Sequence, residues 1–156
     1  MSSTTYNVLI MGASYGSLLG TKLLLAGHSV TLVCTPGTAQ LINRSGTLVR
    51  LPVRGMDTPV SIDSKSLSAG LHAATPDQIE PASYDLVVLA MQEPQYSSPG
   101  VRELLELVAR AKVPCMAIMN MPPLPYLARL PGVDPDKLRD CYTAVSYTHL
   151  TLPTKA

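Results

Sequence analysis

A run of small residues follows the first apolar segment of the chain and carries its strongest chemical signal. It reads GASYGSLLG over residues 12–20, and the residues that we expect to hold a ligand are Gly12, Ala13, Ser14, Tyr15 and Gly16. Between a strand and a helix, glycine permits a tight turn, small side chains let backbone approach a phosphate, and N–H groups at the helix start meet its negative charge. The run predicts a dinucleotide-binding turn, although its spacing departs from the usual G-x-G-x-x-G.

Two consequences are expected of this turn. A β-branched residue in place of Gly12 or Gly16 should prevent cofactor binding, because its side chain resists a positive φ and would clash with the phosphate. Gly16 and Gly20 also lie four residues apart, so they share one face of the expected helix and allow close packing on a sheet.

The same run matches the G-x-S-x-G nucleophile elbow of the α/β-hydrolases, with Ser14 as the candidate nucleophile. Such an enzyme needs a histidine beside the serine. His28 follows the expected first helix and should lie at the opposite edge of the sheet, His72 falls in a polar segment, and His149 lies near the end of the chain. We therefore expect Ser14 to belong to a phosphate loop, and the serine hydrolase is the weaker alternative.

The elements that position this turn follow from hydrophobic periodicity. Strands are expected at residues 7–11, 30–34, 86–90 and 114–119, helices at 15–26 and 36–43, a hairpin or edge pair at 48–53 and 59–62, and a polar connection at 64–81. A third helix should begin after Ser98 with Pro99, because Val101, Leu104, Leu105 and Val108 recur at helical spacing. This alternation predicts an α/β fold: a Rossmann-like, doubly wound, mostly parallel sheet with helices on both faces.

Thr35 follows the second expected strand, where NAD-binding folds commonly place Asp or Glu and NADP-binding folds favour Arg. The sequence here is Cys34-Thr35-Pro36-Gly37-Thr38, which offers hydroxyl groups only. Arg44 could reach a 2′-phosphate from the next turn. The choice between NADP and NAD therefore stays open at this position.

Several stretches resemble the N-terminal NADP-binding domain of the ketopantoate reductase family. They are residues 7–12, residues 16–20, AGHSVTLV at 26–33, YDLVVLA at 84–90 and IMN at 118–120. The resemblance implies hydride transfer from NADPH to a 2-oxo acid, with a dinucleotide and a small 2-oxo acid as the partners. A divergent dinucleotide-binding protein, or a dehydrogenase of another substrate, is the alternative.

The resemblance also assigns residues beyond the first turn. Gln92 stands where the family has a lysine, Gln95 matches a family glutamine, and Asn120 keeps the asparagine of an Asn-Gly pair. By this resemblance Gln92 and Asn120 contact the cofactor, and Asn120 also contacts substrate. The catalytic lysine and acid of the family belong to a second, mostly helical domain, so we expect no catalytic residue here and no activity from this chain alone.

Composition excludes several other classes. The 12 Lys and Arg residues nearly balance the 11 Asp and Glu residues, and Phe and Trp are absent, which argues against nucleic-acid binding. Apolar stretches are too interrupted to span a membrane. The cysteines Cys34, Cys115 and Cys141 lack the spacing of metal ligands, so we expect no metal site. We expect the thiols to be reduced, with Cys34 and Cys115 buried, as is usual in a cytoplasmic protein. No oligomeric state is predicted.

The last dozen residues differ in character from the rest. Residues 145–154 resemble one reading frame of a transposase-type sequencing adapter. We therefore expect residues 1–144 to form an incomplete Rossmann domain and residues 145–156 to be a non-native tail. A natural β-prone tail is the alternative.

Overall fold

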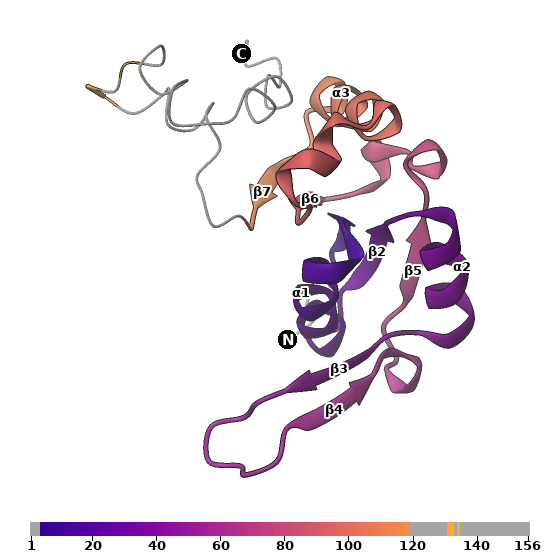
Figure 1. Cartoon of the computed structure of the whole chain (residues 1–156), viewed down its shortest axis with the longest axis vertical. Helices are drawn as coiled ribbons and strands as arrows, with labels where there is room; N and C mark the ends of the chain where they lie inside the picture. The colour runs from indigo at the N-terminus through magenta and orange to yellow at the C-terminus, as the bar shows by residue number, and fades with distance from the viewer. Residues whose placement is uncertain (1–3, 119–130, 133, 135–156) are drawn as a thin grey trace.

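The computed structural model describes residues 4–118, 131, 132 and 134 of the 156-residue chain. At its centre lies a five-stranded sheet in the order β5-β2-β1-β6-β7, and every pairing in it is parallel (Figure 1). Its strands are β1 (Asn7–Met11), β2 (Ser29–Val33), β5 (Leu71–Ala74), β6 (Leu86–Leu89) and β7 (Cys115–Ala117). The predicted Rossmann-like α/β fold is confirmed.

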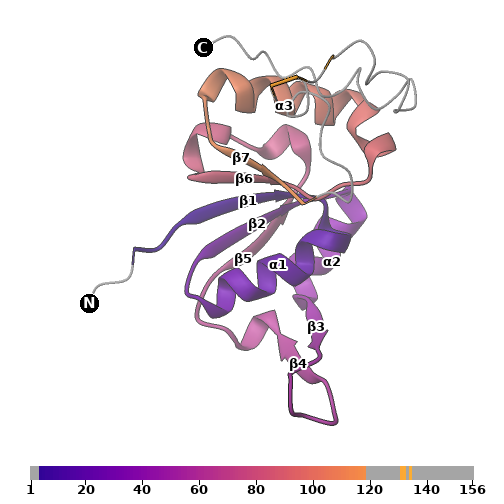
Figure 2. The same ribbon diagram turned by 90° about the vertical axis from the view of Figure 1, so that its left-hand side faces the viewer.

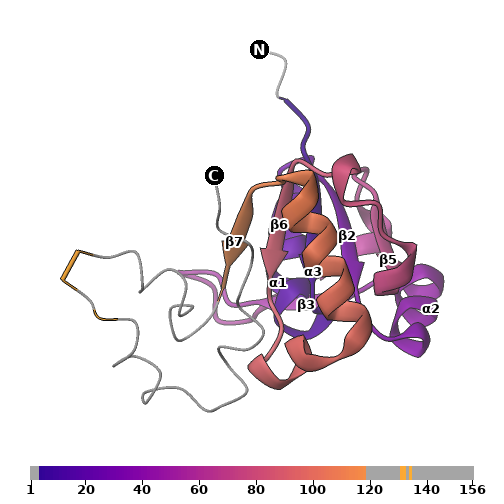
Figure 3. The same ribbon diagram turned by 90° about the horizontal axis from the view of Figure 1, so that it is seen from above.

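Helices cover both faces of this sheet (Figure 2). Successive strand residues point to opposite faces, so the buried strands supply two separate cores. Val8, Ile10, Val30 and Leu32 pack on the side of α1 (Ala13–Leu25) and α2 (Pro36–Ser45), whereas Leu9, Met11, Val87 and Leu89 pack with α3 (Pro99–Ala111). In α3 the four predicted apolar positions are all buried, and Ser98 and Pro99 begin the helix as expected. Figure 3 shows α2 at the β5 edge and β7 at the opposite edge.

Two glycines allow α1 to lie close to the sheet. A Cβ atom on Gly16 would lie 2.5 Å from Ile10 Cγ2, and one on Gly20 would lie 3.3 Å from Val30 Cγ1. Ordinary side chains at these positions would push the helix away. The predicted packing role of this pair is confirmed.

β5 corrects the expectation of a polar connection over residues 64–81. Its sequence LHAA pairs with β2, and Ala73 and Ala74 are buried. Four residues with two alanines give little β signal, and the strand forms because β2 offers a free edge. His72, expected in a loop, therefore lies in this strand.

Asn43 completes the outer edge of β5. Its Nδ2 donates to the Ala73 carbonyl at 2.7 Å, and its Oδ1 accepts from the Ala73 N–H at 2.8 Å. These two bonds replace those that another strand would give, so the side chain ties α2 to the sheet and protects an exposed edge.

Asn43→Ala is expected to lower the free energy of unfolding by about 1–3 kcal/mol, because the buried Ala73 backbone loses both partners. Urea unfolding followed by circular dichroism measures the change. Arg44→Ala is the matched control, since this neighbouring residue is exposed and should change stability by less than about 0.5 kcal/mol. Equal effects in the two variants would contradict this role.

The predicted hairpin is a separate sheet. β3 (Leu48–Leu51) pairs antiparallel with β4 (Val60–Asp63) and extends away from the central sheet (Figure 1). At the other edge, Cys115 was expected to be buried but is exposed, because β7 is an edge strand. Within the described part of the chain, no helix has the length and apolarity needed to cross a membrane.

Candidate functional site

The carboxyl ends of β1, β2 and β6 meet at one edge of the sheet. From β1 the chain continues through β2 towards β5, whereas β6 and β7 lie on the other side of β1. The strand order therefore reverses between β1 and β6. In open α/β sheets, ligands bind in the crevice outside the strands at such a switch point.

Gly12 makes the turn from β1 into α1. Its φ of 109° lies in the region that favours glycine, and its N–H donates to the Val33 carbonyl at 2.9 Å. A Cβ atom here would lie 2.8 Å from both the Ala90 carbonyl oxygen and Met91 Cγ. Because this one residue completes the turn, α1 begins at Ala13, two residues earlier than the predicted start at Tyr15.

The start of α1 presents unpaired donors. The N–H groups of Ala13, Ser14 and Tyr15 occupy the first helical positions, which have no acceptor within a helix. Within the described residues no side chain caps this end, and the first turn contains no acidic residue. The positive end of the helix dipole is thus uncompensated, and a phosphate would satisfy both the donors and the dipole.

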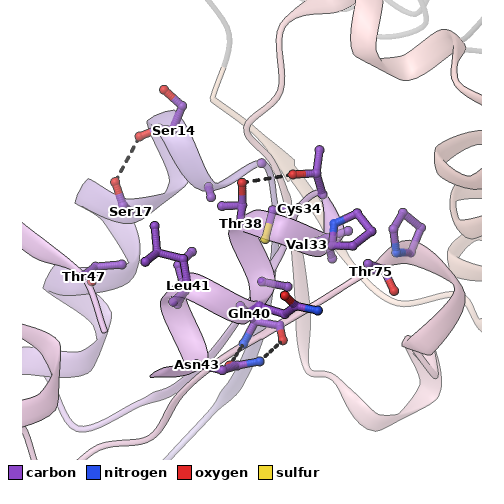
Figure 4. Close-up of a pocket in the computed structure, with 18 of the residues that line it drawn as sticks. Ser14, Ser17, Val33, Cys34, Thr38, Gln40, Leu41, Asn43, Thr47 and Thr75 are labelled. Carbon is purple, nitrogen blue, oxygen red and sulfur yellow. Dashed lines mark hydrogen bonds between the residues drawn. The ribbon is translucent and has the colours of Figure 1, made fainter. Parts of the chain in front are cut away.

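Two cavities open at this turn and share part of its backbone. The smaller, of about 250 Å³, is lined by Gly12, Ala13, Ser14, Tyr15, Ala90, Gln92 and Gln95. The larger, of about 1230 Å³, also includes Gly12, Ala13 and Ser14 and extends along α2 to the start of β3 (Figure 4). The fold therefore brings Gln92, from the loop after β6, to the turn after β1.

Thr35 follows β2 and lies in the wall of the larger cavity. Its Oγ1 is hydrogen-bonded to Oγ1 of Thr38, at 3.0 Å. Cys34 lines the same wall, and burial raises the pKa of its thiol, so the group is neutral at physiological pH. The end of β2 therefore offers a pair of hydroxyl groups and no activated thiol.

One predicted site residue does not line the site, and another is not described by the structure. Gly16 lines neither cavity, because its α-carbon faces Ile10 beneath the helix. Asn120 falls outside the described residues. Conversely, Thr38 and Gln95 line the cavities, although the sequence assigned neither of them a contact with the cofactor. The three-residue spacings Thr35–Thr38 and Gln92–Gln95, typical of helix starts, were the available signal.

The two described histidines, His28 and His72, lie away from Ser14. His28 follows the far end of the 13-residue helix α1, which places it about 20 Å along the helix axis. There its Nδ1 accepts from the Tyr6 N–H at 3.4 Å. His72 lies on β5 and lines neither cavity, and His149 is outside the described residues. Among the described residues, no histidine can act as the base for Ser14.

The charge around the cavities is low. No Lys or Arg lines either cavity in the described part of the chain, and Asp77 is the one charged residue in their walls. Arg44, which could have reached a 2′-phosphate, is not among the lining residues. The positive features that an anion meets among the described residues are therefore the uncapped starts of α1 and α2.

Comparison with known proteins identifies the fold. No family model matches the chain, and no curated protein matches it significantly. A crystal structure of a "putative ketopantoate reductase" from Ralstonia solanacearum MolK2 is similar, with 21% identity and a TM-score of 0.55 over 81% of this chain. The match covers 36% of that protein, so the chain spans about a third of its length. The chain shares its Rossmann-like fold.

Proposed function

We propose that this chain is the cofactor-binding part of an NAD(P)-dependent oxidoreductase resembling ketopantoate reductase. The observation that carries the proposal is the uncapped start of α1, whose Ala13, Ser14 and Tyr15 N–H groups border a cavity at the switch point. The reaction we propose is hydride transfer from NADPH to a 2-oxo acid. NADH is the alternative donor, which the absence of Lys and Arg from the described residues of the larger cavity's wall favours.

The residues present fit a dinucleotide. The diphosphate would meet the N–H groups at the start of α1, where small side chains leave the backbone accessible. The adenosine ribose would meet the hydroxyls of Thr35 and Thr38, and the nicotinamide half would lie towards Gln92. We further propose that Asn120 contacts the nicotinamide ribose or the substrate. When bound, the dinucleotide supplies the hydride, and these residues bind and orient it.

Proton donation and substrate binding require groups other than those that bind the dinucleotide. We place the proton donor and the substrate pocket in a second, helical domain, in keeping with the resemblance. On this proposal residues 1–144 form the cofactor-binding domain of a cytoplasmic enzyme, and residues 145–156 are not native to it. Gln92, in place of the family lysine, favours a substrate other than ketopantoate.

Titration of the purified chain with NADPH and NADH, followed by cofactor fluorescence, tests the proposal. We expect a dissociation constant below about 1 mM for at least one of them. The absence of binding at millimolar concentrations would refute it. The variant Ser14→Ala distinguishes this proposal from the serine-hydrolase alternative. The affinity for the dinucleotide should fall only slightly, whereas a serine hydrolase would lose its activity.

Thr35→Arg is expected to raise the affinity for NADPH about tenfold relative to NADH, because the guanidinium would pair with the 2′-phosphate. The two titrations measure this ratio. Thr58→Arg adds the same charge between β3 and β4, away from both cavities, and should leave the ratio unchanged. An equal gain for both cofactors at Thr35→Arg would show that the ribose does not lie there.

A further inference from the structure

The loop after β6 contains a buried tyrosine. Tyr96 belongs to the short 3₁₀ helix η4 (Glu93–Ser97), is 1% exposed, and packs in the same core as Met11, Val33 and Leu89. Its hydroxyl accepts the Met91 N–H at 3.3 Å. A phenol in an aliphatic core needs a polar partner, and Met91 supplies it.

This hydrogen bond connects the core to the phosphate turn. Met91 lies against Gly12, since a Cβ atom on Gly12 would lie 2.8 Å from Met91 Cγ. The next residue, Gln92, donates its N–H to Gln95 Oε1 at 2.9 Å, which closes the first turn of the loop. Tyr96, Met91 and Gly12 are therefore in continuous contact, and Gln92 is held beside them on the wall of the smaller cavity.

The Tyr96 hydroxyl keeps one protonation state at physiological pH, so its hydrogen bond with Met91 is constant. Burial raises the pKa of the phenol, and the hydrogen bond from Met91 opposes this shift. The hydroxyl is therefore neutral throughout the physiological range, and its bond to Met91 does not vary with pH there.

We propose that Tyr96 is a positioning residue: by holding the Met91 N–H, it keeps Gln92 on the cavity wall where the nicotinamide half of the cofactor passes. The inference rests on the proposed function. β6 lies across the switch point from β2, so the loop serves the nicotinamide half, whereas the adenosine half meets Thr35. Tyr96 should thus affect binding of the whole dinucleotide and not of its adenosine diphosphate part.

The test compares NADH with ADP on the full chain. Tyr96→Phe removes only the hydroxyl and should weaken NADH binding about 5- to 10-fold, while ADP affinity changes less than about twofold. Tyr84→Phe is the matched control, because Tyr84 packs against the same core but precedes β6, at the opposite end of the strand. It should change neither affinity.

The results of this comparison either support or overturn the positioning role of Tyr96. An unchanged NADH affinity in Tyr96→Phe, or an equal loss for NADH and ADP, would overturn the positioning role. If Tyr96→Phe does not fold, Gln92→Ala replaces it, since this side chain is exposed. It should show the same selective loss for NADH, and its failure to do so would overturn the inference. Wild-type protein that binds neither ligand would instead refute the proposed function.

Discussion

Ser14→Asp should abolish dinucleotide binding and leave the protein at least as stable as the wild type. A carboxylate in the first turn of α1 interacts favourably with the free N–H groups and the helix dipole, which stabilises by about 0.3–1 kcal/mol. The same carboxylate accepts hydrogen bonds from the N–H groups that the diphosphate needs, and its negative charge repels the diphosphate. We expect an affinity loss of about 100-fold or more, since each tenfold step corresponds to about 1.4 kcal/mol. Cofactor fluorescence and thermal unfolding measure the two effects.

Ser14→Asn is the control for this substitution. It has the same shape as aspartate and its side-chain oxygen can accept from the same N–H groups, but it carries no charge. Its dinucleotide affinity should stay within about tenfold of wild type. If Ser14→Asp and Ser14→Asn bind equally well, the diphosphate does not lie at the start of α1.

Gly16→Val should lower the free energy of unfolding by about 3 kcal/mol or more, as expected for strong overpacking. The first added carbon would already lie 2.5 Å from Ile10 Cγ2 in the sheet. Urea unfolding measures the loss. Gly37→Val is the control, because a Cβ atom on Gly37 meets nothing within 4 Å, and it should change stability by less than about 1 kcal/mol.

A double-mutant cycle identifies the cause of this effect. Ile10→Ala removes the atoms that the new side chain would meet, so its combination with Gly16→Val should cost less than the sum of the two by at least about 1 kcal/mol. Additive losses would show that the clash with Ile10 is not responsible. The sequence predicted both a clash with the phosphate and close packing on the sheet for Gly16, and the structure shows the packing contact with Ile10.

Most of the fold was predictable because its strands are continuous apolar runs. β1, β2 and β6 are buried on both faces, and such strands are recognisable from hydrophobicity alone. The short strand β5 was missed, since two alanines and a histidine give no clear periodicity and its pairing depends on the free edge of β2. The exposure of Cys115 depends likewise on its place at the sheet edge.

The candidate site was predictable where it lies at strand ends. Gly12, Thr35 and Gln92 follow three different strands, and a parallel sheet brings such residues to one edge. The contact of Tyr96 with Met91 was not predictable, because it depends on the 3₁₀ turn that brings the Tyr96 hydroxyl back to the Met91 N–H. The packing role of Gly16 was visible in its spacing, but its distance from the cavity was not.

The backbone amides at the start of α1 give the most direct test of the central claim. In ¹H–¹⁵N spectra of the labelled chain, addition of NADPH or NADH should move the resonances of Ala13, Ser14 and Tyr15 most strongly. The shifts should saturate and give the same dissociation constant as fluorescence. Saturable binding that leaves these three amides unmoved would contradict the account, because the diphosphate would then be held elsewhere.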